Sequence, residues 1–258
     1  MRLVKKFILY GILLFVASQG FAQLSKVNYL TTFDDKTIHF GFTLGTNYLD
    51  FNVTNYAVMG DNPNFQPTQW QLDGNNQIIN TSSVRSDVSA LVPGFTVGIV
   101  TSLRLSQDLA LRFLPGLSFG ERKLVYNVPV YDGNQKGSDI YQYSIKSTFL
   151  DFPLLVKYKA RRINNDRPYV IFGGAYRQDI SRTAKEDLVK LKNGGFYAEL
   201  GGGWDHYFPY FRLSVEAKFS FGLNDQLGKA PSPQQRQYYT QSIKHLRSKI
   251  FTLLFHFE

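Results

Sequence analysis

Four histidines are the residues of this chain whose chemistry could support acid–base catalysis: His39, His206, His245 and His256. A histidine placed between a hydroxyl nucleophile and a carboxylate acts as the general base of many hydrolases. These four are widely separated in the sequence, and no Gly-x-Ser-x-Gly elbow is set between a strand pattern and a helix pattern. The sequence therefore gives no sign of a catalytic triad, and we expect no enzyme activity.

Whether any of these histidines meet depends on the elements that carry them. His39 and His256 lie on the polar faces of two alternating apolar–polar segments, near the two ends of the chain. If those segments are neighbours in a closed sheet, both histidines could meet a carboxylate. The more ordinary alternative is that they are interior polar groups, hydrogen-bonded to their neighbours.

Metal and cofactor sites are not indicated. No histidine pair has the spacing of zinc ligands, the chain has no cysteine, and no acidic segment matches an EF-hand loop. The run Gly201-Gly202-Gly203 lacks the lysine and the helix of a phosphate-binding loop. We therefore expect no metal and no cofactor, and we interpret these glycines as space within a bendable strand.

The segment FRLSVEAKFSFG, Phe211 to Gly222, alternates strictly between apolar and polar residues. This period of two is typical of a strand whose two faces have unlike surroundings. In a soluble sheet the apolar face would point into a core. In an outer-membrane barrel it would point outward into lipid, and the charged face would line the interior.

The N-terminus has the three parts of a secretory signal peptide. A basic stretch, MRLVKK, precedes the short apolar run FILYGILLFVASQ, and Gly20-Phe21-Ala22 supplies small residues for cleavage. The sequence therefore predicts a signal peptide over residues 1–22 and a mature domain over residues 23–258. A single N-terminal membrane anchor is the alternative, but the apolar run is short for one.

Composition favours an exported all-β protein. The absence of cysteine excludes a disulfide framework, and phenylalanine and tyrosine are abundant, at 22 and 16 residues. The net charge is +9, but the basic residues are scattered and form no helix or cluster with stacking aromatics. Nucleic-acid binding is therefore not expected.

Eight segments of the mature region have strand patterns of about the length that crosses a bilayer at a tilt. They are residues 38–51, 94–105, 109–121, 147–159, 168–180, 195–207, 211–222 and 249–258. The links between them alternate in length. The long ones are Asn52 to Leu91, Arg122 to Gln142, Ser181 to Gly194 and Leu223 to Arg247. This alternation predicts an eight-stranded antiparallel transmembrane β-barrel with short periplasmic turns, long external loops and both termini in the periplasm.

Charged residues of both signs fall on the polar faces of these strands. We expect them to form a network of ion pairs in the barrel lumen, because eight strands enclose a space that side chains can fill. The predicted lumen charges are Arg112, Asp151, Lys157, Glu199, Asp205, Arg212, Glu216 and Lys218. A barrel filled in this way would not be an open channel.

The last strand ends in alternating phenylalanines. Phe255 and Phe257 resemble the C-terminal signal by which outer-membrane barrels are recognised for insertion, and we expect both to face lipid. The alternative is an amphipathic last strand of a soluble barrel such as a lipocalin.

Three segments resemble the PorT family, also described as SprT proteins, of outer-membrane β-barrels in the Bacteroidetes. They are FDDKTIHFGFTLGTNYLDF (Phe33 to Phe51), STFLDFPLLVKYK, and the closing LLFHFE. The resemblance covers essentially the whole mature chain. It is strongest over the first strand and the residues before it, Asp34, Asp35 and Lys36.

The resemblance implies a role in the type IX secretion system, which exports cargo carrying a C-terminal signal domain and supports gliding motility in some species. It further implies the outer membrane as location, with lipid and other secretion components as partners. The alternative is an independent small barrel that binds a ligand or modifies lipid.

Overall fold

The structure is a computed structural model that describes residues 27–63, 78–79, 85–132, 135–181, 189, 191–228 and 238–258. In chain order its elements are η2 (Phe33–Asp35), β1 (Ile38–Asn55), η3 (Met59–Asp61), β2 (Ile78–Ile79), β3 (Arg85–Leu91), β4 (Pro93–Arg104), β5 (Leu109–Phe113), β6 (Gly116–Asp132), β7 (Gln135–Lys159), β8 (Asp166–Asp179), β9 (Gly194–Tyr207), β10 (Arg212–Gly222), α2 (Tyr238–Gln241) and β11 (Ile243–Phe257). None of the helices among these residues is long and apolar enough to cross a membrane.

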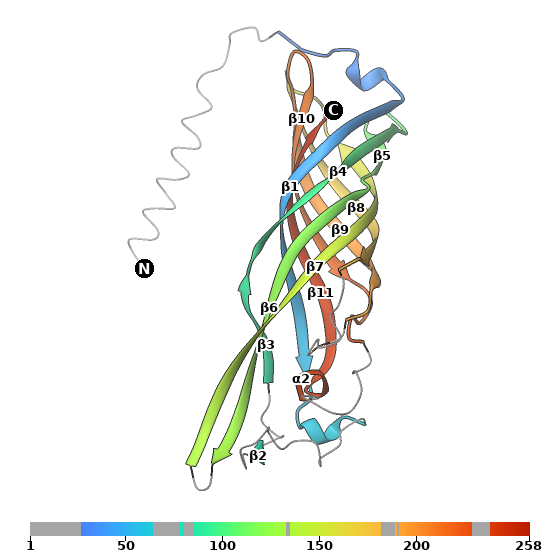
Figure 1. The fold of residues 1–258 in the computed structure, drawn as a ribbon. Helices are drawn as coiled ribbons and strands as arrows, with labels where there is room; N and C mark the ends of the chain where they lie inside the picture. Colours follow the sequence, from blue (N-terminus) through green and yellow to red (C-terminus); the bar gives the residue numbers. More distant parts are fainter. Residues whose placement is uncertain are drawn as a thin grey trace, which may run out of the picture.

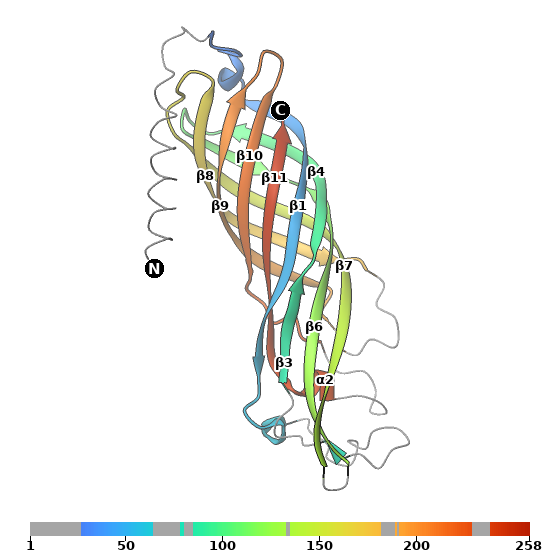
Figure 2. The same ribbon diagram turned by 90° about the vertical axis from the view of Figure 1, so that its left-hand side faces the viewer.

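The strands form one antiparallel sheet that closes on itself (Figures 1 and 2). β1 pairs with β11 on one side and with β4 on the other. From β11 the sheet continues through β10, β9 and β8 to β7, and β5 and β6 together connect β7 back to β4. With β5 and β6 counted as one wall strand, eight strands make the ring. The predicted all-β, eight-stranded barrel is confirmed.

The polar faces of the strands point inward. In β10, Arg212, Ser214 and Glu216 are buried, whereas Val215 and Phe219 are exposed. The same order holds around the ring, where exposed phenylalanines, leucines and isoleucines alternate with buried polar residues. A soluble sheet would bury the apolar set, so the alternation is that of a barrel with an apolar exterior.

The predicted third strand is interrupted. It is divided into β5 and β6 at Leu114-Pro115, because proline has no N–H to donate to the ladder. The wall stays closed there through irregular bonds: Leu114 N–H donates to the carbonyl of Pro153, and Ile99 N–H donates to that of Pro115. Gly98 and Gly116 face each other beside the break, and a Cβ at Gly116 would lie 2.6 Å from a backbone oxygen. The close approach requires glycine.

The link expected from Arg122 to Gln142 is not a loop, and that prediction was wrong. β6 and β7 remain paired from Gly116↔Asp151 to Asp132↔Gln135, as a long hairpin that projects beyond the ring (Figure 1). The segment LVYNVPVY, rich in valine and tyrosine, has high strand propensity and continues β6 past the point where the prediction ended it. β3 pairs with the projecting part of β6 and supports it.

The two ends of the barrel differ. We call the short-turn end the one at which residues 105–108, 160–165 and 208–211 connect strands, and where the chain ends at Glu258. At the opposite end, which we call the long-link end, β1, β8 and β10 end and the β6–β7 hairpin projects. Long and short connections therefore alternate in position, as predicted, although one of the four long ones is a hairpin.

Replacing Phe255 and Phe257 with aspartate should prevent insertion of the barrel. Phe255 is exposed on the outer wall, and the Phe257 ring stacks on that of Phe42 with centroids 4.7 Å apart. A carboxylate in the apolar wall carries a cost that rises with depth in the bilayer. We expect the double variant to be lost from the outer-membrane fraction, as measured by heat-modifiable mobility. The matched Phe255→Leu/Phe257→Leu variant should insert normally, and normal insertion of the aspartate variant would contradict an apolar, lipid-facing role.

Candidate functional site

The interior of the barrel is the most highly charged buried region of the described chain. All eight predicted lumen residues lie inside it, each with at most 5% of its surface exposed. They come from β5, β7, β9 and β10, and the closed ring brings them together. The structure divides them into two clusters, one near the short-turn end and one nearer the middle.

The first cluster is centred on two arginines. Arg112 bonds to Glu216 at 2.8 Å and lies 3.4 Å from Glu258, and Arg212 bonds to Glu258 at 2.6 Å. The Tyr169 hydroxyl donates a further bond to Glu216 at 2.9 Å. Each carboxylate thus has more than one donor, which is the condition under which buried charges are tolerated.

A second pair belongs to the same cluster. Lys157 reaches both oxygens of Asp205, at 2.7 and 2.8 Å, and its ammonium lies 3.6 Å from the centroid of the Tyr169 ring. The Ser214 hydroxyl donates to Asp205 from the adjacent strand. Four elements therefore hold this carboxylate and its partners in place.

The second cluster connects β7, β8, β9 and β10. Lys218 and Arg177 bond to Glu199 at 2.8 and 2.7 Å, and Arg177 lies 3.5 Å from Asp151. The Ser118 hydroxyl, on β6, donates a hydrogen bond to Asp151. Together the two clusters place a charged side chain from most wall strands in the lumen.

The sequence prediction missed three charged residues that point into the lumen. Arg177 was overlooked because both faces of its strand are apolar or glycine, although Arg167 and Arg177 lie ten residues apart on one face. Glu258 is the last residue of the predicted final strand, on the face opposite Phe255 and Phe257, so the alternation could have identified it. Arg122 was assigned to a loop; it is buried, donates to Ser248 at 2.9 Å and stacks 4.3 Å above the Phe51 ring.

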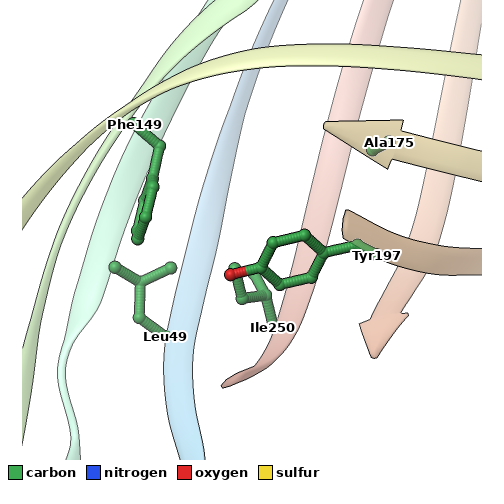
Figure 3. Close-up of a cluster of buried hydrophobic side chains, with 5 residues drawn as sticks. All are labelled: Leu49, Phe149, Ala175, Tyr197 and Ile250. Carbon is green, nitrogen blue, oxygen red and sulfur yellow. The ribbon is translucent and has the colours of Figure 1, made fainter. Parts of the chain in front are cut away.

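An apolar layer separates these clusters from the long-link end. Leu49, Phe149, Ala175, Tyr197 and Ile250 are buried together inside the ring (Figure 3). Their side chains project from five different strands toward the barrel axis. Because they are packed against one another, they fill the cross-section beyond the charged residues.

The histidines do not form a common site. His39 is buried beneath the ring of Phe33, with centroids 4.2 Å apart. His256 is buried, hydrogen-bonded to the Thr43 hydroxyl at 2.7 Å and 3.4 Å from Glu216. His256 therefore does meet a carboxylate.

The other two histidines lie near opposite ends of the barrel and pair with aspartates. His206 bonds to Asp166 at 2.7 Å, and His245 bonds to Asp225 at 2.9 Å. Burial raises the pKa of Asp225. The bond to His245 and bonds from two backbone N–H groups lower this pKa by a larger amount, so it lies below the usual range.

A Gly-x-Ser-x-Gly match occurs at Gly116 to Gly120, but inside β6. Its Ser118 is buried and bonded to Asp151 rather than raised on a strand-to-helix turn. Among the residues described, no group of three or more histidine, aspartate or glutamate side chains could hold a metal ion.

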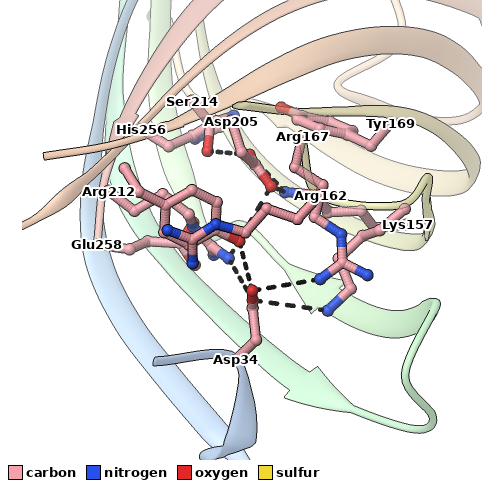
Figure 4. A network of polar contacts seen from close by, with 12 residues as sticks. Asp34, Lys157, Arg162, Arg167, Tyr169, Asp205, Arg212, Ser214, His256 and Glu258 are labelled. Carbon is pink, nitrogen blue, oxygen red and sulfur yellow. Dashed lines mark hydrogen bonds and ion pairs between the residues drawn. The ribbon is translucent and has the colours of Figure 1, made fainter. Parts of the chain in front are cut away.

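Asp34 closes the charged region at the short-turn mouth. Its carboxylate accepts a bond from the Tyr207 hydroxyl at 2.6 Å and lies within 4.0 Å of Arg167, Arg212 and Lys159 (Figure 4). Burial raises the pKa of Asp34, but the Tyr207 bond and the three cations lower it by more, so its pKa lies below the usual range.

Asp35 and Lys36, which the resemblance groups with Asp34, are placed differently. Asp35 is largely exposed and lies 3.5 Å from Arg104, and Lys36 is exposed. Beside them is a polar cleft of about 370 Å³ on the rim, lined by Asp34, Asp35, Arg104, Gln107, Asp108, Arg161, Arg162 and Arg167.

A closed ring of eight antiparallel strands, apolar outside and charged inside, defines the class of outer-membrane β-barrels. In agreement with the geometry, residues 21–228 match the family model described as "Outer membrane protein beta-barrel domain". The chain belongs to this family, and the protein is therefore an outer-membrane protein.

Comparison with solved structures finds a similar chain in the crystal structure of the outer membrane protein OprG from Pseudomonas aeruginosa. The two are 12% identical, the match covers 84% of this chain and 92% of that one, and the TM-score is 0.39. No curated protein matches the chain in sequence.

Replacing Glu216 with alanine should destabilise the folded barrel strongly. The change leaves Arg112 without its 2.8 Å partner inside the lumen, and breaking a buried ion pair typically costs about 3–5 kcal/mol. Glu121→Ala is the matched control, because Glu121 is partly exposed and 3.9 Å from Lys123, where an ion pair is worth about 1 kcal/mol or less. Urea unfolding in detergent micelles measures both. Equal stability of the two variants would show that the luminal pair is not structural.

Proposed function

We propose that this protein is a non-catalytic accessory or assembly subunit of the type IX secretion machinery. It acts through contacts with other components rather than as the conduit. The proposal is supported by the resemblance of residues 33–51, 147–159 and 253–258 to the PorT family, and by membership of an outer-membrane barrel family. A role in gliding motility would follow in species whose gliding uses this system.

The observation that carries the proposal is the filled lumen. Ion pairs centred on Glu216, Asp205 and Glu199 cross the interior, and the apolar layer around Tyr197 lies beyond them. A cavity of about 30 Å³ beside Asp151 has room for a water molecule or two. An extended chain, still less a folded domain, requires far more space.

A non-catalytic role agrees with the placement of the polar groups. Thr43, His256 and Glu216 are in contact in the order of a nucleophile, a base and a carboxylate. All three side chains are buried within the barrel, so a substrate would have no path to the hydroxyl. We interpret this arrangement as part of the network that fills the lumen.

The orientation proposed here places the short-turn end in the periplasm. An N-terminal signal peptide over residues 1–22 would deliver the chain there, and outer-membrane barrels keep their short turns on that side. Glu258 is bonded to Arg212 at the start of β10, and the segment that begins at Val27 is bonded to Asn165 in the β7–β8 turn, so both termini would be periplasmic. The hairpin of β6 and β7 would then project from the cell.

The alternative is an independent barrel that binds a ligand or modifies lipid, and the rim cleft of about 370 Å³ is the feature that favours it. The two functions differ in what loss of the gene does. Only a secretion component is required for export of cargo bearing the C-terminal signal domain, whereas an independent barrel would leave that export intact.

Purified protein should give no large conductance in planar bilayers, and deletion of its gene should abolish export of type IX cargo. The first follows from the filled lumen, and the second from the accessory role. Large stable steps from the monomer would contradict the closed barrel. Normal export in the deletion strain, with cargo in the culture medium measured by immunoblot, would instead contradict the secretion role.

A tag inserted between Asp132 and Gln135 should be labelled on intact cells, whereas one inserted after Asn164 should be labelled only after the outer membrane is opened. The first position joins β6 to β7 at the long-link end, and the second lies in the turn between β7 and β8 at the short-turn end. Antibody binding before and after permeabilisation measures both. Labelling of the Asn164 insertion on intact cells would reverse the orientation.

A further inference from the structure

The segment from Val27 to Lys36 lies across the short-turn mouth without joining the sheet. The turn between β7 and β8 holds its backbone: the side-chain amide of Asn165 donates to the Val27 carbonyl and accepts from the Tyr29 N–H, both at 2.9 Å. Arg162 in the same turn donates to the carbonyls of Tyr29 and Leu30. These bonds hold the backbone of residues 27–30 and do not depend on the side chains of the segment.

A second set of contacts does depend on the side chains. Asp34 enters a pocket formed by Lys159, Arg167, Tyr207 and Arg212, which come from four consecutive strands, β7 to β10 (Figure 4). One carboxylate thus lies within reach of three cations and a hydroxyl. Removing it would leave these cations with less negative charge at the mouth of a desolvated lumen.

One apolar side chain adds to these contacts. The Phe33 ring stacks on that of His39, with centroids 4.2 Å apart, and the Arg212 guanidinium lies 4.8 Å from its centroid. The N-terminal part is less buried, since Val27 is 68% exposed and Tyr29 is 37% exposed. Leu30 has a φ of 48°, in the left-handed region that is unfavourable for a residue with a branched side chain. The segment is therefore retained by polar contacts and one aromatic ring, and its backbone strain at Leu30 favours release.

We propose that the short-turn mouth is a binding site for a peptide bearing an aspartate, and that Val27 to Lys36 occupies it in cis as a releasable strap. The Asn165–Arg162 turn binds the backbone, and the pocket of Lys159, Arg167, Tyr207 and Arg212 binds the carboxylate. When the strap leaves, the same groups accept a segment of another chain that has the same two features. The proposal rests on the geometry of the mouth and does not require the secretion role.

The first test compares Asp34→Asn with Asp35→Asn in the full-length protein. Asp34→Asn removes the charge from the pocket, whereas Asp35 is mostly exposed and outside it. Hydrogen exchange of residues 27–36, measured in micelles, should accelerate about tenfold or more in the Asp34 variant, because charge-assisted bonds are lost. The Asp35 variant should exchange as the unaltered chain does, and heat-modifiable mobility should show that both barrels remain folded.

The second test asks whether the vacated mouth binds a peptide. A synthetic peptide of residues 27–36, added at millimolar concentration to the Asp34→Asn protein, should slow exchange at the β7–β8 turn. The same peptide with asparagine at position 34 should not. Unchanged exchange in the Asp34 variant would show that Asp34 does not latch the strap. Accelerated exchange without any effect of the peptide would show that the mouth is not a peptide site.

Discussion

The pairing of charges inside a narrow barrel is the interaction on which the rest of this structure depends. Arg112, Arg212 and Lys157 are buried in a lumen from which wall strands exclude lipid and most water. Each would be strongly destabilising alone, and each is held by a carboxylate within 2.8 Å. The register of the strands is thereby fixed, because a shift of one residue would turn the luminal charges outward and the exposed phenylalanines inward.

Apolar clusters accompany the ion pairs in the lumen. Val100, Leu114, Leu155, Tyr169 and Ile171 pack beside the first charged cluster, and Leu49, Phe149, Ala175, Tyr197 and Ile250 form an apolar layer beyond the charges. On the far side Arg122 is bonded to hydroxyl groups and stacked between the rings of Phe51 and Phe149. A guanidinium stacked on aromatic rings retains favourable electrostatics without a carboxylate. Charge, apolar packing and cation–π contact thus fill one narrow space together.

Most of the fold could be predicted from the sequence, because period-two alternation and turn placement are local signals. The prediction from these signals fails where the local pattern and the pairing of strands in the fold disagree. Pro115 lies inside an otherwise regular pattern and divides the strand, and the extension of β6 past Arg122 depends on pairing with β7 and β3. The eight predicted lumen charges followed from alternation, and three ion pairs join members of that set: Arg112–Glu216, Lys157–Asp205 and Lys218–Glu199. The exact pairing depends on which strands are neighbours. Arg177 lies on a strand with two largely apolar faces, and Asp34 lies outside the strands, where no periodicity indicates direction.

The filled lumen also determines where the protein can interact with other molecules. With the interior occupied by its own side chains, the remaining surfaces are the lipid-facing wall and the two ends. At the long-link end a two-stranded hairpin stands clear of the ring (Figure 2), and at the short-turn end a strap covers three cations. The hairpin is held by a continuous ladder of backbone bonds, whereas the strap depends on one carboxylate, one aromatic ring and a few bonds to its backbone. A single exchange of contacts can therefore alter the short-turn end while the barrel stays folded, which makes that end the more suitable one for a change of partner.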